Sequence, residues 1–559
     1  MEKIWVVKDK KYDDIITQLL YNRGVDVSDR SDIKQYLSPE FSKSMPDPFL
    51  LPDMDKAVNR IIEAKNANQI VGIFADYDAD GIPGAAFLAK TLSQLGIQHQ
   101  VYIPSREEGY GLSEVGINYL IEKKVELIIT VDLGIRNQKE ALYCAEQSID
   151  LIVTDHHVPG DDLPSCVAVV DPKIVGSKYP FCELSGAAVA YKLAYALSTH
   201  FPKELNESFL KWNLDLIAIS TISDVVPLIR DNRTICYFGL NVLQKSKNVG
   251  IRSLIEIAKI DQKNMKAYHV GFQIGPRINA PGRMDHATKS YQILVTEDEK
   301  EAKELAEWLE SKNIERQEAM DKVEREASNE ILKRELFRDN IIIVKGKKWP
   351  KGVIGPTASR LSDKFNRPII ILSQSENVLT GSARSLPGVD IVKILEQAKE
   401  FVIKYGGHAG AAGLTLLEEQ FEGFRLAINQ ASKSISVEDL LQKVKIDLAV
   451  KFNDIDLKII DELDKFEPFG MGNPKPIFAS YDLSIVSSRF VGKDEKHISL
   501  FLSDGSRELK AIYFNCEDKD YFNKIKGKKV KVAYNLVKDE WNGNAKPSLN
   551  IIDIKLDNA

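Results

Sequence analysis

Three aspartates stand two positions apart in the stretch ADYDADG, residues 75–81, and a glycine follows the third. A single aspartate at the end of a strand is most often a turn or helix-capping residue. Three in one turn, Asp76, Asp78 and Asp80, repel one another, and this repulsion costs free energy unless a cation offsets it. The cluster therefore predicts a site for metal ions.

Further candidate ligands follow along the chain. Asp132 stands in TVDLGI, the run Asp155, His156 and His157 stands in TDHHVPG, and Asp224 stands in ISDVVPL. Carboxylate oxygens mixed with imidazole nitrogens suit Mn²⁺ or Mg²⁺ better than the sulfur-rich ligand set of structural zinc. So many acids indicate two ions. Two divalent ions about 4 Å apart can activate a water and clamp the leaving oxygen of a phosphoester, so the set predicts phosphoryl hydrolysis.

The expected strands bring these residues to one edge of a sheet. From about residue 68, short apolar runs such as QIVGIFA, ELIITV and DLIVT alternate with helix-like stretches, which is typical of a doubly wound parallel sheet in an α/β protein. The first run ends at the aspartate cluster, the second at Asp132 and the third at Asp155. Ligands bind outside the carboxyl ends of the strands in such sheets, so the three strand ends are expected to converge on one crevice.

The rest of the chain divides by pattern. Residues 297–336 contain no Gly or Pro and place apolar residues at helical intervals, which predicts one long connecting helix. A second α/β pattern follows, and short alternating strands towards the end predict a small β-barrel that carries the lysine-rich stretch KIKGKKVKVAY. The expected parts are an N-terminal segment (1–45), a catalytic domain (46–285), the connecting helix (286–336), a second α/β domain (337–435) and the barrel (436–559).

Composition limits the class of protein. A chain of 559 residues is too long for one hydrophobic core, and 44% hydrophobic with 28% charged residues is typical of a globular protein in water. The net charge of -6 argues against a generally basic surface, so a nucleic-acid site must be local. Five cysteines without a Cys-x-x-Cys spacing indicate a reducing compartment, and neither a secretory signal nor a long apolar run is present. These features predict a cytoplasmic protein without a membrane span.

Several motifs of the chain resemble those of a known superfamily. DYDADG, TVDLGI, TDHHVP and ISDVVPL, in this order, resemble the four motifs of the DHH phosphoesterase superfamily. Further stretches, among them YIPSREEGYGLS, GPRINAPGRM, GSARSLPG and GGHAGAAGL, are similar to the RecJ family of single-strand-specific DNA exonucleases. The resemblance runs from about residue 15 to the end. It implies a DHH domain, a DHHA1-like domain and an OB-fold, with 5′ to 3′ hydrolysis of single-stranded DNA to mononucleotides in recombination and repair.

The resemblance also implies roles for individual residues. Two Mn²⁺ or Mg²⁺ ions are expected at Asp76, Asp78, Asp80, Asp132, His156 and Asp224. In the catalytic group, Asp132 is expected to bridge the ions, His157 to contact the scissile phosphate and Asp155 to orient its neighbours. Substrate binding is expected at Arg106, Arg277, Asn279, Ser382, Arg384 and His408. The alternative for the arginines is that they only pair with acids between the two lobes.

Some positions depart from the family pattern. Pro350 stands where the family motif WHxGVIG has histidine, and Leu133 replaces a cysteine. Neither change removes a proposed metal ligand, but the first bears on how the second lobe grips the nucleotide. Expected partners are single-stranded DNA, single-strand-binding protein and a repair helicase.

Two other interpretations stay open. One is a DHH phosphoesterase that acts on oligoribonucleotides, cyclic dinucleotides or nucleoside bisphosphates, a group that generally lacks the barrel. The other is a non-catalytic replication scaffold that has lost its ligands.

Overall fold

The computed structural model describes residues 3–557 apart from residues 107, 285, 517–521, 523 and 542–543. The chain forms two compact units. The larger unit consists of Pro48–Asp224 and Gly239–Gln442, and the smaller unit consists of Met1–Asp47, Val225–Phe238 and Lys443–Ala559. The chain therefore passes from the larger to the smaller unit directly after Asp224 and returns within one helix. None of the described helices combines the length and the apolar character that a bilayer crossing requires.

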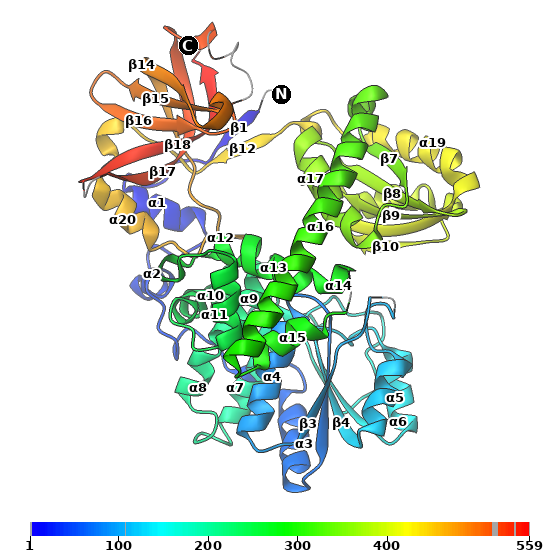
Figure 1. Ribbon diagram of the computed structural model, residues 1–559. Coiled ribbons are helices and arrows are strands. Elements are labelled where there is room, and N and C mark those ends of the chain that lie inside the picture. The colour runs from blue at the N-terminus through cyan, green and yellow to red at the C-terminus, as the bar shows by residue number, and fades with distance from the viewer. Residues whose placement is uncertain are drawn as a thin grey trace. The chain divides into compact units, whose positions relative to one another are not determined.

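A five-stranded parallel sheet is the centre of the first part of the larger unit, in the order β3-β2-β4-β5-β6. The strands are β2 (Ile70–Ala75), β3 (His99–Tyr102), β4 (Val125–Val131), β5 (Asp150–Thr154) and β6 (Ala168–Val170). Helices α5 (Glu114–Glu122) and α6 (Gln138–Glu146) pack on one face, and α3 (Met54–Asn66), α4 (Gly81–Gln94) and α7 (Gly186–Ser198) pack on the other (Figure 1). Both faces are covered, which explains why the strands read as continuous apolar runs.

The residue that follows each central strand continues the ladder of hydrogen bonds. The backbone N–H of Asp76 donates to Val131 O, that of Asp132 donates to Thr154 O, and that of Asp155 donates to Val170 O. Each of these aspartates is thus fixed at the position directly after its strand and is in register with the neighbouring strand. This arrangement is the physical basis of the convergence that the sequence predicted.

Helices complete this part of the larger unit, and the one that begins at Arg230 lies in the smaller unit as far as Phe238. They are α8 (Glu207–Trp212), α9 (Leu214–Ser223), α10 (Arg230–Leu243), α11 (Val249–Ile257), α12 (Ala267–His269), the π-helical turn η3 (Val270–Ile274), α13 (Gly275–Asn279), α14 (Pro281–Met284) and α15 (Thr288–Val295). The expected long helix is confirmed as α16 (Glu299–Lys333), which is 35 residues long (Figure 1). Its N-cap residue Asp298 accepts hydrogen bonds from the backbone N–H groups of Lys300 and Glu301, which fixes its start.

The second α/β part contains a mixed sheet in the order β10-β11-β9-β8-β7. Its strands are β7 (Ile342–Lys347), β8 (Ile369–Ser375), β9 (Val378–Arg384), β10 (Lys404–His408) and β11 (Ala411–Leu417). Only the β7–β8 pair is parallel. Helix α17 (Lys351–Phe365) and α16 cover one face, while α18 (Ile391–Glu396) and α19 (Phe421–Ala431) cover the other (Figure 1).

The smaller unit contains the expected barrel. Its strands are β14 (Phe478–Val491), β15 (His497–Ser503), β16 (Glu508–Tyr513), β17 (Lys529–Trp541) and β18 (Asn544–Leu556), and pairing of β14 with β17 closes the ring. Shorter elements of this unit are β12 (Lys443–Ile446), β13 (Leu448–Ala449) and α20 (Leu457–Asp464).

Residues from the beginning of the chain also belong to the smaller unit. Strand β1 (Ile4–Val7) pairs with β12, and α1 (Ile15–Asn22) contributes buried leucines to the barrel core, while α2 (Arg30–Leu37) follows it. The local sequence pattern did not indicate this packing.

Candidate metal centre and adjoining groove

The aspartate loop is a tight turn between β2 and α4. Oδ1 of Asp78 accepts hydrogen bonds from the backbone N–H groups of Asp80, at 2.7 Å, and Gly81, at 3.2 Å. A Cβ atom at Gly81 would lie 2.4 Å from the backbone oxygen of Asp76, so a side chain at this position would break the turn. From outside the loop, Oδ1 of Asn279 accepts from the N–H of Ala79 at 2.8 Å.

Asp80 is held by the amino end of α7. Its Oδ2 accepts from Gly186 N at 2.7 Å, and its Oδ1 accepts from Ala187 N at 2.8 Å and from Ser220 Oγ at 2.6 Å. The helix amino end favours a carboxylate, and these three hydrogen bonds fix the position of the Asp80 side chain. Gly186 is needed here because a Cβ at this position would lie 2.5 Å from Asp132.

His156 lies between three of the carboxylates. Its Nε2 is 3.1 Å from Asp132 Oδ1 and 3.7 Å from both Asp80 Oδ2 and Asp224 Oδ2. Its Nδ1 is 2.8 Å from the carbonyl oxygen of Leu184, a contact that requires the proton on Nδ1. The Nε2 lone pair is therefore free to bind a metal ion, and burial lowers the pKa of His156, which favours the neutral ring that such binding needs.

Asp155 organises the pair of histidines. Its Oδ1 accepts from the backbone N–H groups of His156 and His157 and lies 2.8 Å from Nδ1 of His157, while its Oδ2 accepts from Ile135 N. Burial alone would raise the pKa of Asp155, but the hydrogen bonds outweigh it and the pKa is lowered. Burial alone would likewise lower the pKa of His157, yet the bond to Asp155 and the nearby carboxylates raise it. Asp155 is therefore an anion and His157 tends towards the cation.

Tyr110 is a member of the site that the sequence did not reveal. Its hydroxyl lies 2.9 Å from Nδ1 of His157 and 3.1 Å from the backbone oxygen of Asp132. It stands between two glycines with positive φ, Gly109 and Gly111. The sequence EGYG was a signal for an unusual turn, but its contact with His157 depends on tertiary packing.

Three groups of side chains each place ligand atoms within 4.8 Å of one another. They are Asp132, His156 and His157; Asp80, His156 and Asp224; and Asp76, Asp78 and Asp132. Asp132 belongs to two of them and has a positive φ of 65°. The structure thus brings all the predicted metal-binding residues together.

The electrostatics of this cluster fit a cation. Burial, and then the charges of neighbouring carboxylates, raise the pKa values of Asp76 and Asp132 well above the ordinary range and that of Asp224 to about 9. Oδ1 of Asp76 and Oδ1 of Asp132 are buried and accept no hydrogen bond from the described residues. Buried carboxylate oxygens that lack donors are stabilised by divalent ions, so the residues present fit the metal that the motifs imply.

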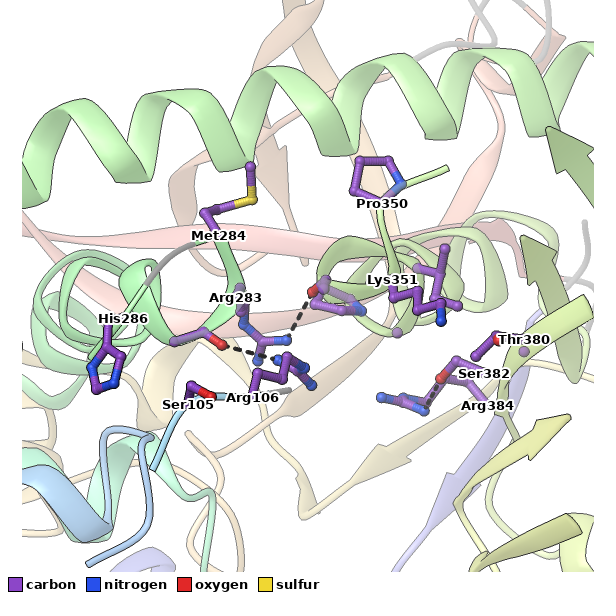
Figure 2. A pocket seen from close by; sticks show the side chains of 16 residues that line it. Ser105, Arg106, Arg283, Met284, His286, Pro350, Lys351, Thr380, Ser382 and Arg384 are labelled. Carbon is purple, nitrogen blue, oxygen red and sulfur yellow. Dashed lines mark hydrogen bonds between the residues drawn. The ribbon is translucent and has the colours of Figure 1, made fainter. Parts of the chain in front are cut away.

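A groove of about 990 Å³ adjoins the cluster, between the first sheet's loops and the second α/β part. Figure 2 shows Arg106, Arg283, Lys351 and Arg384 around it, with Ser382 beside Arg384. Arg384 donates to Ser382 Oγ at 2.9 Å, and Arg283 donates to Gly352 O at 3.1 Å. Burial and the nearby Arg106 lower the pKa of Arg283 to about 10, so it is still a cation at neutral pH.

A smaller cavity of about 150 Å³ joins the groove to the aspartates. Arg106 and Arg283 line both spaces, and Asp76, Asp78 and Asn279 line the smaller one. An anion bound in the groove would therefore lie next to the candidate metal centre.

Two predicted substrate residues line neither space. Arg277 forms an ion pair with Glu310 of α16, with Nε 2.6 Å from Oε2, as the alternative interpretation of the arginines expects. His408 is exposed on the edge strand β10, where its Nδ1 accepts from Gly410 N. Their substrate-binding roles stay predictions. The lining cations that the sequence analysis did not select are Arg283, the second arginine of GPRINAPGR, and Lys351, which follows Pro350 at the start of α17.

Comparisons with known proteins agree with these features. Residues 70–221 match the DHH family, N-terminal domain, residues 338–434 match the DHHA1 domain, and residues 446–553 match the RecJ OB domain. The expected succession of DHH, DHHA1-like and OB-fold domains is confirmed.

Several relatives match over most of the chain. The chain is 35% identical over 543 residues to the single-stranded-DNA-specific exonuclease RecJ of Bacillus subtilis (96% of this chain, 67% of that one). It is 34% identical over 526 residues to that of Haemophilus influenzae (90% of each). The structure of RecJ in complex with Mn²⁺ from Thermus thermophilus matches with a TM-score of 0.83 at 27% identity, covering 100% of this chain and 80% of that one.

Proposed function

The chain belongs to the RecJ family of single-stranded-DNA-specific exonucleases, and from this premise we propose that it hydrolyses the terminal phosphodiester of single-stranded DNA and releases mononucleotides from the 5′ end. The observation that carries the proposal is the junction between an acidic metal-binding cluster and a groove lined by cations. Such a junction places a phosphate beside divalent ions, which is the arrangement that phosphodiester hydrolysis requires.

Two Mn²⁺ or Mg²⁺ ions are the proposed cofactors, because solved relatives are complexes with Mn²⁺ and with Mg²⁺ and the donor set is rich in carboxylates. The proposed ligands are Asp76, Asp78, Asp80, Asp132, His156 and Asp224. When bound, the ions supply positive charge that polarises the phosphoester and favours ionisation of the attacking water.

The chain's own groups orient the substrate. His157, positioned and made more basic by Asp155, is proposed to donate a hydrogen bond to an oxygen of the scissile phosphate. The hydroxyl of Tyr110 contacts the same nitrogen of His157 and helps to fix the ring. The catalytic group is therefore His157, Asp155 and Asp132, and no side-chain nucleophile is required.

The groove is the proposed site for the terminal phosphate. Arg106 and Arg384 approach from different parts of the larger unit, and Ser382 supplies a hydroxyl (Figure 2). Arginines recognise phosphate oxygens through paired hydrogen bonds, so a strand with a 5′-phosphate is the preferred substrate. Asn279 acts indirectly, because it holds the aspartate loop.

The barrel is proposed to bind the part of the single-stranded DNA that lies outside the active site. Phe501 on β15 is exposed and lies opposite Lys510 of β16. Exposed rings beside cations stack bases and attract the backbone of single strands. A small-nucleotide phosphoesterase has no use for this surface, and the matched OB domain disfavours that alternative. The retained ligand set disfavours a non-catalytic scaffold.

The cellular role is proposed from the family resemblance alone. It comprises DNA recombination and repair in the cytoplasm, with single-strand-binding protein and a repair helicase as partners.

Digestion of end-labelled DNA tests the proposal. Two identical single strands, labelled at the 5′ or the 3′ end, are incubated with Mn²⁺ and either the wild-type protein or Asp132→Ala. We expect immediate release of the 5′ label as a mononucleotide by the wild-type protein only. If the 3′ label is released first, the proposed polarity is wrong. If both strands stay intact while dinucleotides are hydrolysed, the metal site stands and the assigned substrate is wrong.

A further inference from the structure

Tyr268 and Phe272 form an exposed aromatic pair on the larger unit. Their ring centroids are 5.0 Å apart with an interplanar angle of 29°, so the rings are stacked. Tyr268 is 61% exposed and Phe272 is 72% exposed. Water-exposed rings of this size contribute little to folding, and neither residue takes part in the metal cluster or the groove described above.

The pair is carried by an unusual backbone element. Phe272 lies in the π-helical turn η3, and Tyr268 lies four positions earlier, in α12. Single π-turns are rare and concentrate at functional sites, where they change the direction in which side chains project. Phe272 is thus presented by a backbone element of the kind that concentrates at functional sites.

The same turn packs against the end of α9, directly before Asp224. A Cβ atom on Gly275 would lie 2.3 Å from Ser223 Oγ, and one on Gly271 would lie 3.5 Å from Cγ2 of Ile222. Only a glycine at position 275 permits this approach. The helical segment that carries the aromatic pair thus packs against the end of α9, next to the proposed metal ligand Asp224.

Residues 267–284 connect the pair with the rest of the site in a fixed order. After the turn comes Asn279, which holds the aspartate loop, and then Arg283, which lines the groove. An unbroken α-helix of the same number of residues as from Tyr268 to Arg283 would rise about 22 Å. In the sequence, Asn279, which contacts the aspartate loop, therefore stands between the aromatic pair and Arg283, which lines the groove.

We infer that Tyr268 and Phe272 are a stacking platform for bases of the single strand beyond the scissile phosphodiester. The inference rests on the proposed function. A strand whose terminal phosphate occupies the groove and whose scissile phosphate lies at the metal cluster continues towards the pair. Two rings that are already stacked leave outer faces for a base at little cost in conformational entropy, and stacking accepts every base, as an exonuclease requires.

Binding of single strands to the full-length protein tests the platform. Affinity is measured in EDTA, which prevents hydrolysis, for a labelled oligothymidylate and for a strand of the same length whose internal residues lack bases. The variants are Phe272→Ala, Phe272→Leu, Phe272→Trp and Tyr268→Ala. Trp212→Ala is the matched control, because Trp212 is 43% exposed and precedes α9 at the end opposite Asp224.

We expect Phe272→Ala and Tyr268→Ala to weaken oligothymidylate binding on the order of tenfold, with no change for the strand without bases. Phe272→Trp should retain wild-type affinity, whereas Phe272→Leu should not. All variants should hydrolyse dinucleotides in Mn²⁺ at the wild-type rate, which also shows that they are folded.

Other outcomes overturn the platform. If Phe272→Ala binds oligothymidylate with wild-type affinity, the pair is not a platform for DNA bases. An equal loss on both strands would point to a backbone or folding effect instead. Neither result bears on catalysis. The proposed function fails separately, if the wild-type protein degrades no single strand in Mn²⁺.

Discussion

The hydroxyl of Tyr110 and Nδ1 of His157 lie 2.9 Å apart, and the same nitrogen is 2.8 Å from Oδ1 of Asp155. The phenol and the carboxylate therefore both restrain the imidazole at the same nitrogen. Because the phenol also reaches the backbone oxygen of Asp132, it connects His157 to the strand end that supports the acidic cluster. Tyr110 is a positioning residue for His157.

Removal of this hydroxyl should reduce turnover while leaving metal binding intact. We expect Tyr110→Phe to lower kcat on single-stranded DNA by about tenfold, because one orienting hydrogen bond contributes about 1–1.5 kcal/mol. The affinity for Mn²⁺ should change little, since the phenol is not a proposed ligand. Steady-state kinetics and metal titration of the same preparations measure the two quantities. An unchanged kcat would contradict the positioning role.

The crowded carboxylates predict a trade-off between stability and function. Asp132→Asn replaces a carboxyl whose pKa is raised by burial and by neighbouring carboxylates with an amide that cannot ionise. In EDTA we expect the variant to be more stable than the wild-type protein, by about 1–2 kcal/mol. In Mn²⁺ the order should reverse, because the wild-type protein gains more from metal binding.

Thermal unfolding with and without Mn²⁺ measures this reversal. Asp161→Asn is a suitable control, because Asp161 is an exposed carboxylate of the same part of the chain. Equal metal-induced stabilisation of Asp132→Asn and the wild-type protein would exclude Asp132 as a ligand.

The cations of the groove predict that a DNA strand with a 5′-phosphate is a better substrate than one with a 5′-hydroxyl. Arg384→Met should reduce the ratio of kcat/KM for a 5′-phosphorylated strand to that for a 5′-hydroxyl strand by about tenfold or more, since a charge-assisted bond to phosphate is lost. Arg425→Met is the matched control, because Arg425 is a partly exposed arginine of α19 that forms an ion pair with Glu422 and does not line the groove. If Arg384→Met leaves this ratio unchanged, the groove is not the binding site of the terminal phosphate.

The strand ends of the site were predictable from local sequence. Apolar runs fix where β2, β4 and β5 end, and the parallel ladder then places Asp76, Asp132 and Asp155 in register. No knowledge of distant contacts was needed, because a parallel sheet aligns the carboxyl ends of its strands. The proposed metal-binding residues were therefore chosen from spacing and resemblance together.

The choice between neighbouring arginines was not predictable in this way. Arg277 and Arg283 stand in one motif, six residues apart, and the break between α13 and α14 separates their directions. Glu310, which pairs with Arg277, comes from the long helix and is distant in sequence. The pairing of β1 with β12 likewise joins residues more than 400 positions apart, a contact that no local pattern contains.

A buried carboxyl outside the ligand set gives a pH dependence with a definite sign. Burial raises the pKa of Asp171 to about 7, because Oδ2 accepts no hydrogen bond from the described residues and only Lys173 N donates to Oδ1. Between about pH 4 and pH 7 the folded protein holds a proton on Asp171 that the unfolded chain has released. The free energy of unfolding therefore falls as the pH rises through this range.

Asp171→Asn should remove this dependence. In EDTA the variant should match the wild-type protein near pH 4 and exceed its stability at pH 8, by up to about 4 kcal/mol for three pKa units. The difference between variant and wild type, measured by urea unfolding across this range, cancels the titration of groups that both proteins share. A difference that stays constant with pH would show that the Asp171 carboxyl is already ionised in the folded protein at pH 4. The buried Oδ2 would then need a donor that the surrounding residues do not provide.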